Sequence, residues 1–225
     1  MKYKLNKLYN MDCMEAMKQI PDNYFELAIV DPPYGLGFGT YNRTNKTNGI
    51  RYKANKYKNS SWDTNIPDDD YFVELIRVSK NQIVWGGNYF PTLWSLGGKG
   101  FIFWHKGNPV KNFADGELAW TSFNKPARQF DYRYFGNLEG NSSTSDKIHP
   151  TQKPIALYEW LLNNYAKKGD KILDTHVGSA SSLIACYNLG FDYLGFELDE
   201  DYYNMAQKRI ETRKNQLDIF NDMGL

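Results

Sequence analysis

One tetrapeptide with an acid, two prolines and an aromatic residue constrains this chain more than any other stretch. Asp31-Pro32-Pro33-Tyr34 follows the apolar run 27–30, which predicts a short buried strand. Proline has a fixed φ angle and no N–H, so neither proline can donate to a strand ladder and the strand must end there. The predicted turn presents a carboxylate and backbone carbonyls beside an aromatic ring. This surface suits a planar group that carries an exocyclic amine and stacks on Tyr34.

Strands and helices alternate along most of the 225 residues, a length that buries a full core and fits a single domain over 1–225. Alternation of this kind predicts an α/β fold with a mostly parallel sheet and helices on both faces. We expect strands at 5–10, 26–30, 82–85, 101–104, 117–123, 171–173 and 193–196, and helices that begin near 12, 67, 89, 154, 180 and 199. The strands at 101–104 and 117–123 flank a polar segment, so an antiparallel hairpin is expected there. Residues 124–148 show no clear period and are expected to form a loop.

The net charge of +1, from 27 basic and 26 acidic residues, excludes a uniformly basic nucleic-acid binder. Positive charge is instead concentrated in the polar stretch 36–62, which contains no acidic residue. A solvated loop has the same composition, but basic side chains between tyrosines also suit a phosphate backbone with displaced bases nearby. We favour this second interpretation and expect DNA contacts from Arg43, Arg51, Lys53, Lys56 and Lys58.

The two cysteines, Cys13 and Cys186, lie far apart in the sequence and form no CxxC pair. This spacing predicts reduced thiols, as in a cytoplasmic protein, and no metal site. The N-terminus leads into no long apolar run, so we expect neither a signal peptide nor a membrane span.

Four predicted strands lead into an acidic side chain: Asp12, Asp31, Asp174 and Glu197. Sheets of this kind bind ligands at the carboxyl ends of their strands. Between Asp174 and Glu197, the small residues Gly178 and Ser179 let the backbone approach a ligand. Glu197 can accept hydrogen bonds from two ribose hydroxyls, which is a nucleoside-binding pattern. A pyrophosphate loop uses three glycines and this turn has one, so no dinucleotide is expected.

Four segments in this order resemble the amino-group DNA methyltransferases of the β arrangement. They are Asp31-Pro32-Pro33-Tyr34, His149-Pro150-Thr151-Gln152-Lys153-Pro154, Asp174 to Ser181, and Phe196-Glu197-Leu198-Asp199. Enzymes of that family use S-adenosylmethionine to methylate adenine N6 or cytosine N4. The resemblance covers nearly the whole chain and implies a circularly permuted Rossmann-like methyltransferase fold. The catalytic turn then precedes the cofactor loop, and the chain begins on the strand that would follow the 199–214 helix.

The resemblance also implies roles for individual residues. Asp31, Pro32, Pro33 and Tyr34 would hold a target base flipped out of the duplex. The cofactor would contact Asp12, Cys13, Thr151, Lys153, Asp174, Thr175, His176, Gly178, Ser179, Glu197 and Leu198, with Glu197 on the ribose and Thr151 and Lys153 near the methionine carboxylate. The chain departs from the family pattern Asp-Pro-Phe-x-Gly-Ser-Gly in one segment, Asp174 to Ala180, where His176 replaces the aromatic ring and Ala180 adds a methyl group where glycine is common. We expect His176 to be packed or hydrogen-bonded and not to act as a base.

The expected reaction is direct methyl transfer to adenine N6 in DNA, without a nucleophilic cysteine. Adenine is favoured because the turn begins with Asp, where cytosine enzymes of this family often carry Ser. Two alternatives stay open: an amino-methyltransferase for cytosine N4 or RNA, and a catalytically silent subunit that binds cofactor or DNA. The segment 105–148 corresponds to a short target-recognition region. A homodimer and a restriction-endonuclease counterpart are compatible with the resemblance, and neither follows from the sequence.

Overall fold

The computed structural model describes residues 2–37, 63–98, 100–107, 114–133, 148–149 and 151–222, with side chains described as far as residue 216. Most of the basic stretch 36–62 and much of the segment 105–148 therefore lie outside the described residues.

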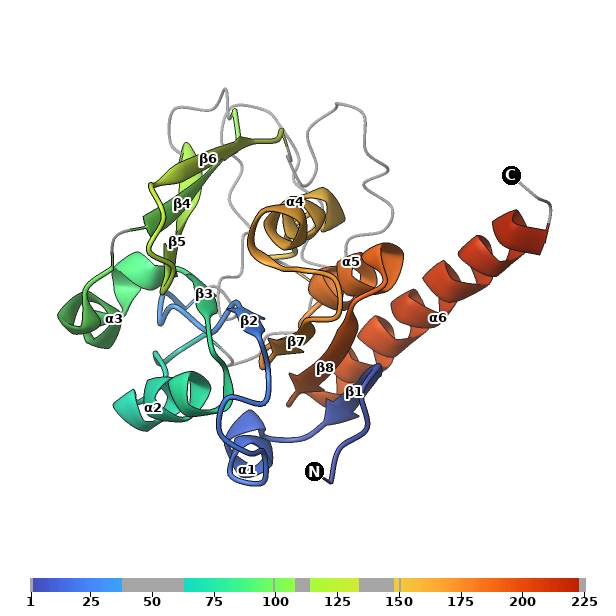
Figure 1. The fold of residues 1–225 in the computed structure, drawn as a ribbon, viewed down its shortest axis with the longest axis horizontal. Helices are drawn as coiled ribbons and strands as arrows, with labels where there is room; N and C mark the ends of the chain where they lie inside the picture. The colour runs from blue at the N-terminus through green and yellow to red at the C-terminus, as the bar shows by residue number, and fades with distance from the viewer. Residues whose placement is uncertain are drawn as a thin grey trace, which may run out of the picture.

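An eight-stranded sheet forms the centre of the described molecule, with the strand order β1-β8-β7-β2-β3-β5-β4-β6 (Figure 1). Its strands are β1 (Lys7–Asn10), β2 (Leu27–Val30), β3 (Gln82–Trp85), β4 (Gly100–His105), β5 (Gly116–Thr121), β6 (Arg128–Asp131), β7 (Lys171–Asp174) and β8 (Asp192–Glu197). Neighbouring strands pair in parallel except where β5 pairs with β3 and β4, so β5 alone among these eight runs in the opposite direction. This confirms the predicted mostly parallel sheet with one antiparallel hairpin strand.

Strand β6 corrects one expectation. We expected 124–148 to lack regular structure, but Arg128–Asp131 pairs in parallel with β4 at the edge of the sheet. Three of its four residues are exposed and the fourth is half-buried. A strand at an edge with so little burial carries no apolar run, and for this reason the sequence pattern did not reveal it.

Helices cover both faces of the sheet (Figure 1). The helices are α1 (Cys13–Met17), α2 (Asp69–Val78), the 3₁₀ helix η2 (Gly87–Tyr89), α3 (Pro91–Leu96), α4 (Ile155–Tyr165), α5 (Ser181–Leu189) and α6 (Glu200–Asp222). Strand β2 shows how the two layers form, because its four buried side chains alternate between the faces. Leu27 and Ile29 pack with residues of α4, α5 and α6, whereas Ala28 and Val30 pack with residues of α1, α2 and α3.

The first strand lies beside the last one. β1 pairs in parallel with β8 over four residues, from Lys7 opposite Leu194 to Asn10 opposite Glu197. The first strand of the chain is therefore the edge strand beside the last one, β8. This arrangement confirms the predicted permutation. None of the described helices is long and apolar enough to span a membrane.

The turn after β3 requires a glycine. Gly86 adopts φ +69°, a left-handed conformation that disfavours residues with a side chain. A Cβ atom on Gly86 would lie 2.2 Å from Cε1 of Tyr34, so the backbone and the ring are in direct contact. The conformation of this turn thus makes room for the tyrosine of the Asp-Pro-Pro-Tyr turn.

Gly86→Ala is expected to destabilise the protein more than Gly190→Ala does. Gly190 has a similar φ of +72°, but a Cβ atom there would meet no other atom within 4 Å, so alanine incurs only the left-handed penalty of about 1 kcal/mol. At Gly86 the overlap with Tyr34 adds to this, and we expect a total of roughly 2–4 kcal/mol. Urea denaturation of both variants measures the difference. Equal losses would mean that the ring moves aside freely.

Candidate active site

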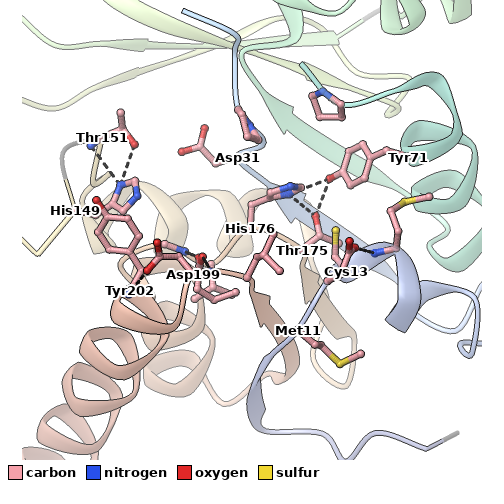
Figure 2. Close-up of a pocket in the computed structure, with 18 of the residues that line it drawn as sticks. Met11, Cys13, Asp31, Tyr71, His149, Thr151, Thr175, His176, Asp199 and Tyr202 are labelled. Atoms are coloured by element: carbon pink, nitrogen blue, oxygen red, sulfur yellow. Dashed lines mark hydrogen bonds between the residues drawn. The ribbon is translucent and has the colours of Figure 1, made fainter. Parts of the chain in front are cut away.

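A cavity of about 630 Å³ lies at the edge of the sheet where β1, β2, β7 and β8 have their carboxyl ends (Figure 2). Ten of the eleven residues expected to bind a cofactor line it: Asp12, Cys13, Thr151, Lys153, Thr175, His176, Gly178, Ser179, Glu197 and Leu198. From the predicted catalytic turn, Asp31 and Pro33 line the same cavity, while Pro32 and Tyr34 do not line it. One cavity thus brings the two predicted halves of the site together.

Asp31 reaches this cavity because β2 ends one residue before it, and both of its carboxylate oxygens are engaged. Oδ1 accepts a hydrogen bond of 2.6 Å from the hydroxyl of Tyr34, and Oδ2 accepts one of 2.5 Å from Nζ of Lys153. Each oxygen of a carboxylate has a second lone pair. The carboxylate is therefore held in a fixed orientation and can still accept further donors.

The ring of Tyr34 already packs against another aromatic ring. It stacks on Tyr89 with 5.1 Å between ring centroids and 19° between ring planes. Its backbone N–H and that of Gly35 both donate to Oδ1 of the buried Asp63, at 2.8 and 3.0 Å. The sequence did not predict that Tyr89 or Asp63 would contact this turn. A stacking role of Tyr34 toward a ligand stays a prediction, and in this structure one face of the ring is covered by Tyr89.

Lys153 is buried and bridges two acids. Its side chain is 2% exposed, and Nζ lies 2.5 Å from Oδ2 of Asp31 and 3.1 Å from Oε2 of Glu117 on β5. The second oxygen of Glu117 pairs with Lys106, which follows β4. Lys153 also lines the cavity, and its expected position near a cofactor carboxylate stays a prediction. Its charge is directed at the two acids, which sequence spacing could not indicate.

The pKa directions in this cluster follow from burial and from the sharing of one cation. Burial raises the pKa of Asp31, and the neighbouring Lys153 only partly offsets that. Burial also opposes ionisation of Glu117, but Lys153 and Lys106 together lower its pKa to about 2. For Lys153, burial favours the neutral amine, yet the two acids outweigh it and raise the pKa. The lysine is thus charged, and Asp31 is the more easily protonated of the two acids.

Asp174 does not line the cavity, although it was predicted to be among the cofactor-binding residues. It is buried, and it holds the loop after β7 by accepting from the backbone N–H of His176 at 2.9 Å and from the Ser182 hydroxyl. Burial raises the pKa of Asp174 to about 7. Its position supports a role in shaping the loop.

The next two residues of the loop form a small polar cluster with α2. Oγ1 of Thr175 lies 2.7 Å from the hydroxyl of Tyr71 and 2.9 Å from Nδ1 of His176 (Figure 2). Burial lowers the pKa of His176 to about 4, so the imidazole is neutral near pH 7. The packed and hydrogen-bonded state expected for His176 agrees with these contacts.

Glu197 ends β8 and lines the same cavity. Oε2 accepts from the backbone N–H of Gly178 at 2.8 Å, and Oε1 accepts from that of Asp199 at 3.0 Å. Each oxygen keeps a lone pair for a further donor. Gly178 has φ +53°, and a Cβ atom there would lie 3.8 Å from the ring of His149, so the backbone is open toward the cavity.

Two further predicted residues stand at the end of β1. Asp12 caps α1 by accepting from the N–H of Met14 at 2.7 Å. Burial raises the pKa of Cys13 to about 12, so its thiol stays protonated and is a poor nucleophile. On the other side, Oγ1 of Thr151 lies 3.1 Å from Nδ1 of His149, whose ring packs on Tyr202 at 4.3 Å between centroids.

Several lining residues were not predicted: Met11, Met14, Asn65, Ile66, Pro67, Asp68, Asp70, Tyr71, His149, Tyr158, Val177, Asp199 and Tyr202. The stretch 67–70 has the composition of an ordinary helix start, and nothing in it distinguishes a helix that faces a cavity. His149 lies within one of the four segments that resemble the methyltransferase family, and this position was the available signal.

The predicted DNA-binding residues Arg43, Arg51, Lys53, Lys56 and Lys58 lie outside the described residues. Within the part of the chain that is described, no group of three or more His, Cys, Asp or Glu side chains could hold a metal ion.

Comparison with known proteins gives a family match and several relatives. A family model for DNA methylases, N6_N4_Mtase, matches residues 48–208, a range that begins after the Asp-Pro-Pro-Tyr turn. The type II methyltransferase M.HinfI of Haemophilus influenzae is 26% identical over 260 residues, which cover 96% of this chain and 71% of that protein.

Two solved structures share the fold. The crystal structure of the M1.HpyAVI–SAM complex has a TM-score of 0.59 and 23% identity, and the alignment covers 90% of this chain and 98% of that one. The PvuII DNA methyltransferase, described as cytosine-N4-specific, also has a TM-score of 0.59, with 14% identity and coverage of 93% and 91%. Both likenesses support the α/β fold of this chain.

Asp174→Asn is expected to alter the pH dependence of stability. The carboxyl ionises with a pKa of about 7 in the folded protein and roughly 3.9 in an unfolded chain. Wild-type stability therefore contains a contribution that is fully present below about pH 4 and lost as the pH rises through 7, amounting to at most about 4 kcal/mol. Asn keeps both hydrogen bonds, because the Ser182 hydroxyl can accept as well as donate.

Urea denaturation between pH 4 and 8 checks this. The variant should gain stability relative to wild type as the pH rises across that window. Parallel curves for the two proteins would show that the carboxyl ionises normally in the folded state.

Proposed function

The chain belongs to the DNA methylase family, and from this premise we propose that it transfers the methyl group of S-adenosylmethionine to the N6 amine of adenine in DNA. The observation that carries this proposal is the placement of Asp31 at the same cavity as Gly178 and Glu197. An acceptor for an amine and an acceptor for ribose hydroxyls thus line one cavity.

The cavity fits S-adenosylmethionine in size and in the chemistry of its wall. Its volume of about 630 Å³ falls within the roughly 300–1,000 Å³ typical of small-ligand sites. Glu197 offers two lone pairs to vicinal hydroxyls, and the open backbone at Gly178 allows close approach. Asp12 offers a carboxylate at the end of β1. When bound, S-adenosylmethionine supplies an electrophilic methyl group on a sulfonium sulfur.

Asp31 would act on the target amine. The nitrogen lone pair of adenine N6 is delocalised into the ring, so the amine is a weak nucleophile. Asp31 would accept a hydrogen bond from this amine and favour the tetrahedral nitrogen, and its charge would stabilise the positive charge that develops there. Tyr34 and Lys153 hold the carboxylate in place, so little reorganisation is needed during the reaction. The base must leave the helix to reach this position.

Cytosine N4 is the second candidate target, and the likeness to the PvuII enzyme favours it. Both bases present an exocyclic amine to an acceptor, so Asp31 serves either. The Asp at the start of the turn supports adenine, since cytosine enzymes of this family often have Ser there. Because M.HinfI is named as a type II methyltransferase, we also propose a restriction endonuclease as the counterpart of this enzyme.

Mass spectrometry of nucleosides tests the target. After incubation of the protein with DNA and S-adenosylmethionine, we expect N6-methyldeoxyadenosine. If only N4-methyldeoxycytidine is found, the target is cytosine and not adenine. If DNA of diverse sequences stays unmodified, the proposed activity is wrong.

Asp31→Asn is expected to lower the single-turnover methylation rate on the order of a hundredfold, the scale of losing one preorganised electrostatic partner. The amide keeps the shape of the side chain and loses its charge. Tritiated cofactor measures the transfer, and calorimetry should show nearly unchanged cofactor affinity, because Glu197 and the loop at Gly178 would make most of the cofactor contacts. Near-normal transfer by this variant would make Asp31 a structural turn residue.

The basic stretch is proposed to bind phosphates. Replacing Lys53, Lys56 and Lys58 with Ala should weaken DNA binding to a similar extent on all sequences. The slope of log K against log salt should fall by about 0.9 for each phosphate that the variant no longer neutralises. A triple variant of the exposed Lys4, Lys7 and Lys18 provides the same change in net charge. If both triples act alike, net charge explains the effect and the stretch makes no specific phosphate contacts.

A further inference from the structure

Glu117 reaches the site because β5 runs against the other strands. An antiparallel strand begins at the edge where its parallel neighbours end. The N–H of Gly86, just after β3, donates to the carbonyl of Leu118 at 2.8 Å, which places the start of β5 beside the end of β3. Glu117, the second residue of β5, is therefore delivered to the carboxyl edge of the sheet.

Four charged side chains form a row of successive ion pairs that begins at the cavity, in the order Asp31, Lys153, Glu117 and Lys106. Adjacent members form ion pairs, with 2.5 Å between Asp31 and Lys153 and 3.1 Å between Lys153 and Glu117. The side chain of Lys153 is 2% exposed and that of Glu117 is 25% exposed, so water screens these charges weakly. Two acids and two bases leave the row neutral.

The row divides the charge of one ammonium between two acids. If Lys153 faced Asp31 alone, its charge would neutralise that carboxylate and weaken it as an acceptor for an amine. Glu117 attracts the same ammonium, and its own negative charge acts on Asp31 through a medium of low dielectric. Lys106 has the opposite effect on Asp31, because its positive charge compensates the negative charge of Glu117.

We propose that Glu117 is a positioning residue for methyl transfer, which shares the ammonium of Lys153 and thereby keeps Asp31 a strong hydrogen-bond acceptor for the target amine. This inference rests on the proposed function and adds to it a residue outside the Asp-Pro-Pro-Tyr turn. Glu117 does not line the cavity, so it acts on the reacting atoms only through Lys153 and Asp31.

The groups that act on Asp31 come from several elements: Tyr34 of its own turn, Lys153 before α4, Glu117 of β5, Tyr71 of α2, Tyr158 of α4 and Asp174 of β7. Burial raises the pKa of each of these three tyrosines well above 10, so they stay neutral at working pH. His176 also lines the cavity with Asp31 and is neutral (Figure 2). Asp174, with a pKa of about 7, changes its charge near neutral pH. It is not substituted in the variants below, so a difference between a variant and wild type is caused by the substituted member of the row.

Two substitutions of opposite sign test the proposal. Glu117→Gln removes the competitor for Lys153, and Lys106→Gln removes the cation that compensates Glu117. The acidic limb of the single-turnover rate, which follows protonation of Asp31, should move to lower pH in Glu117→Gln and to higher pH in Lys106→Gln, each by on the order of one pH unit. The plateau rate of Glu117→Gln should fall on the order of tenfold, with the cofactor affinity within about twofold of wild type.

A purely structural role predicts a different outcome, in which both variants lose rate or stability and neither limb moves. Such a result, or shifts in the same direction, would overturn the proposal. If Glu117→Gln fails to fold, the limb of Lys106→Gln decides alone.

Carbon-13 NMR titration of aspartate carboxyls gives a readout that needs no activity, with the Asp31 resonance assigned through its absence in Asp31→Asn. The Asp31 titration should shift down in Glu117→Gln and up in Lys106→Gln. Unshifted titrations overturn the role of Glu117 even if DNA is methylated normally. If the wild-type protein leaves DNA unmethylated, the proposed function is overturned. The titrations then still decide whether Glu117 changes the pKa of Asp31.

Discussion

The common direction of its parallel strands is the constraint on which this site depends. A buried strand such as β2 admits no polar side chain along its length, since all four of its residues are enclosed by helices on both faces. After these four residues, the first polar side chain is that of Asp31, where the strand leaves the sheet. Because β1, β2, β7 and β8 are parallel, these exits share one edge, and Asp12, Asp31 and Glu197 meet there although they are far apart in the sequence. The reversed strand β5 adds Glu117 to the same edge by starting where the others end.

Gathering acids at one edge creates an electrostatic problem, which the buried lysine solves. An isolated carboxylate or ammonium inside a protein is strongly destabilised, and removing one partner of a buried pair costs about 3–5 kcal/mol. Lys153 pairs with two acids, and Lys106 balances the second, so each charge has a partner of opposite sign. In the pair of Lys80 and Glu26 the lysine side chain is 52% exposed, and ion pairs with an exposed partner contribute about 0–1 kcal/mol. Burial therefore makes the row near Asp31 rigid and sensitive to each of its members.

Local chemistry decided how much of this the sequence could reveal. The Asp-Pro-Pro-Tyr turn was predictable, because proline ends a strand by its own covalent structure, and so was the small-residue turn at Gly178. Side-chain partners across the sheet were not, since the pairing of Lys153 with Asp31 joins residues 122 positions apart. Asp174 shows the same limit. Its place after a strand resembled that of Asp31 and Glu197, yet its side chain turns back to Ser182 and His176 and away from the cavity. Strand β6 escaped because an exposed edge strand needs no apolar pattern.

The unusual loop after β7 is best understood through its partners. Ala180 adopts φ +63°, the conformation for which the family uses glycine, and this costs about 1–2 kcal/mol. Its methyl group is fully buried, so packing offsets part of that cost. His176 replaces an aromatic ring at a half-buried position, where an imidazole nitrogen without a hydrogen-bond partner would be destabilising. Thr175 and Tyr71 supply the missing partners, at 2.9 and 3.5 Å from Nδ1. Both replacements are thus compatible with the fold, because Nδ1 of His176 has hydrogen-bond partners and the methyl group of Ala180 is buried.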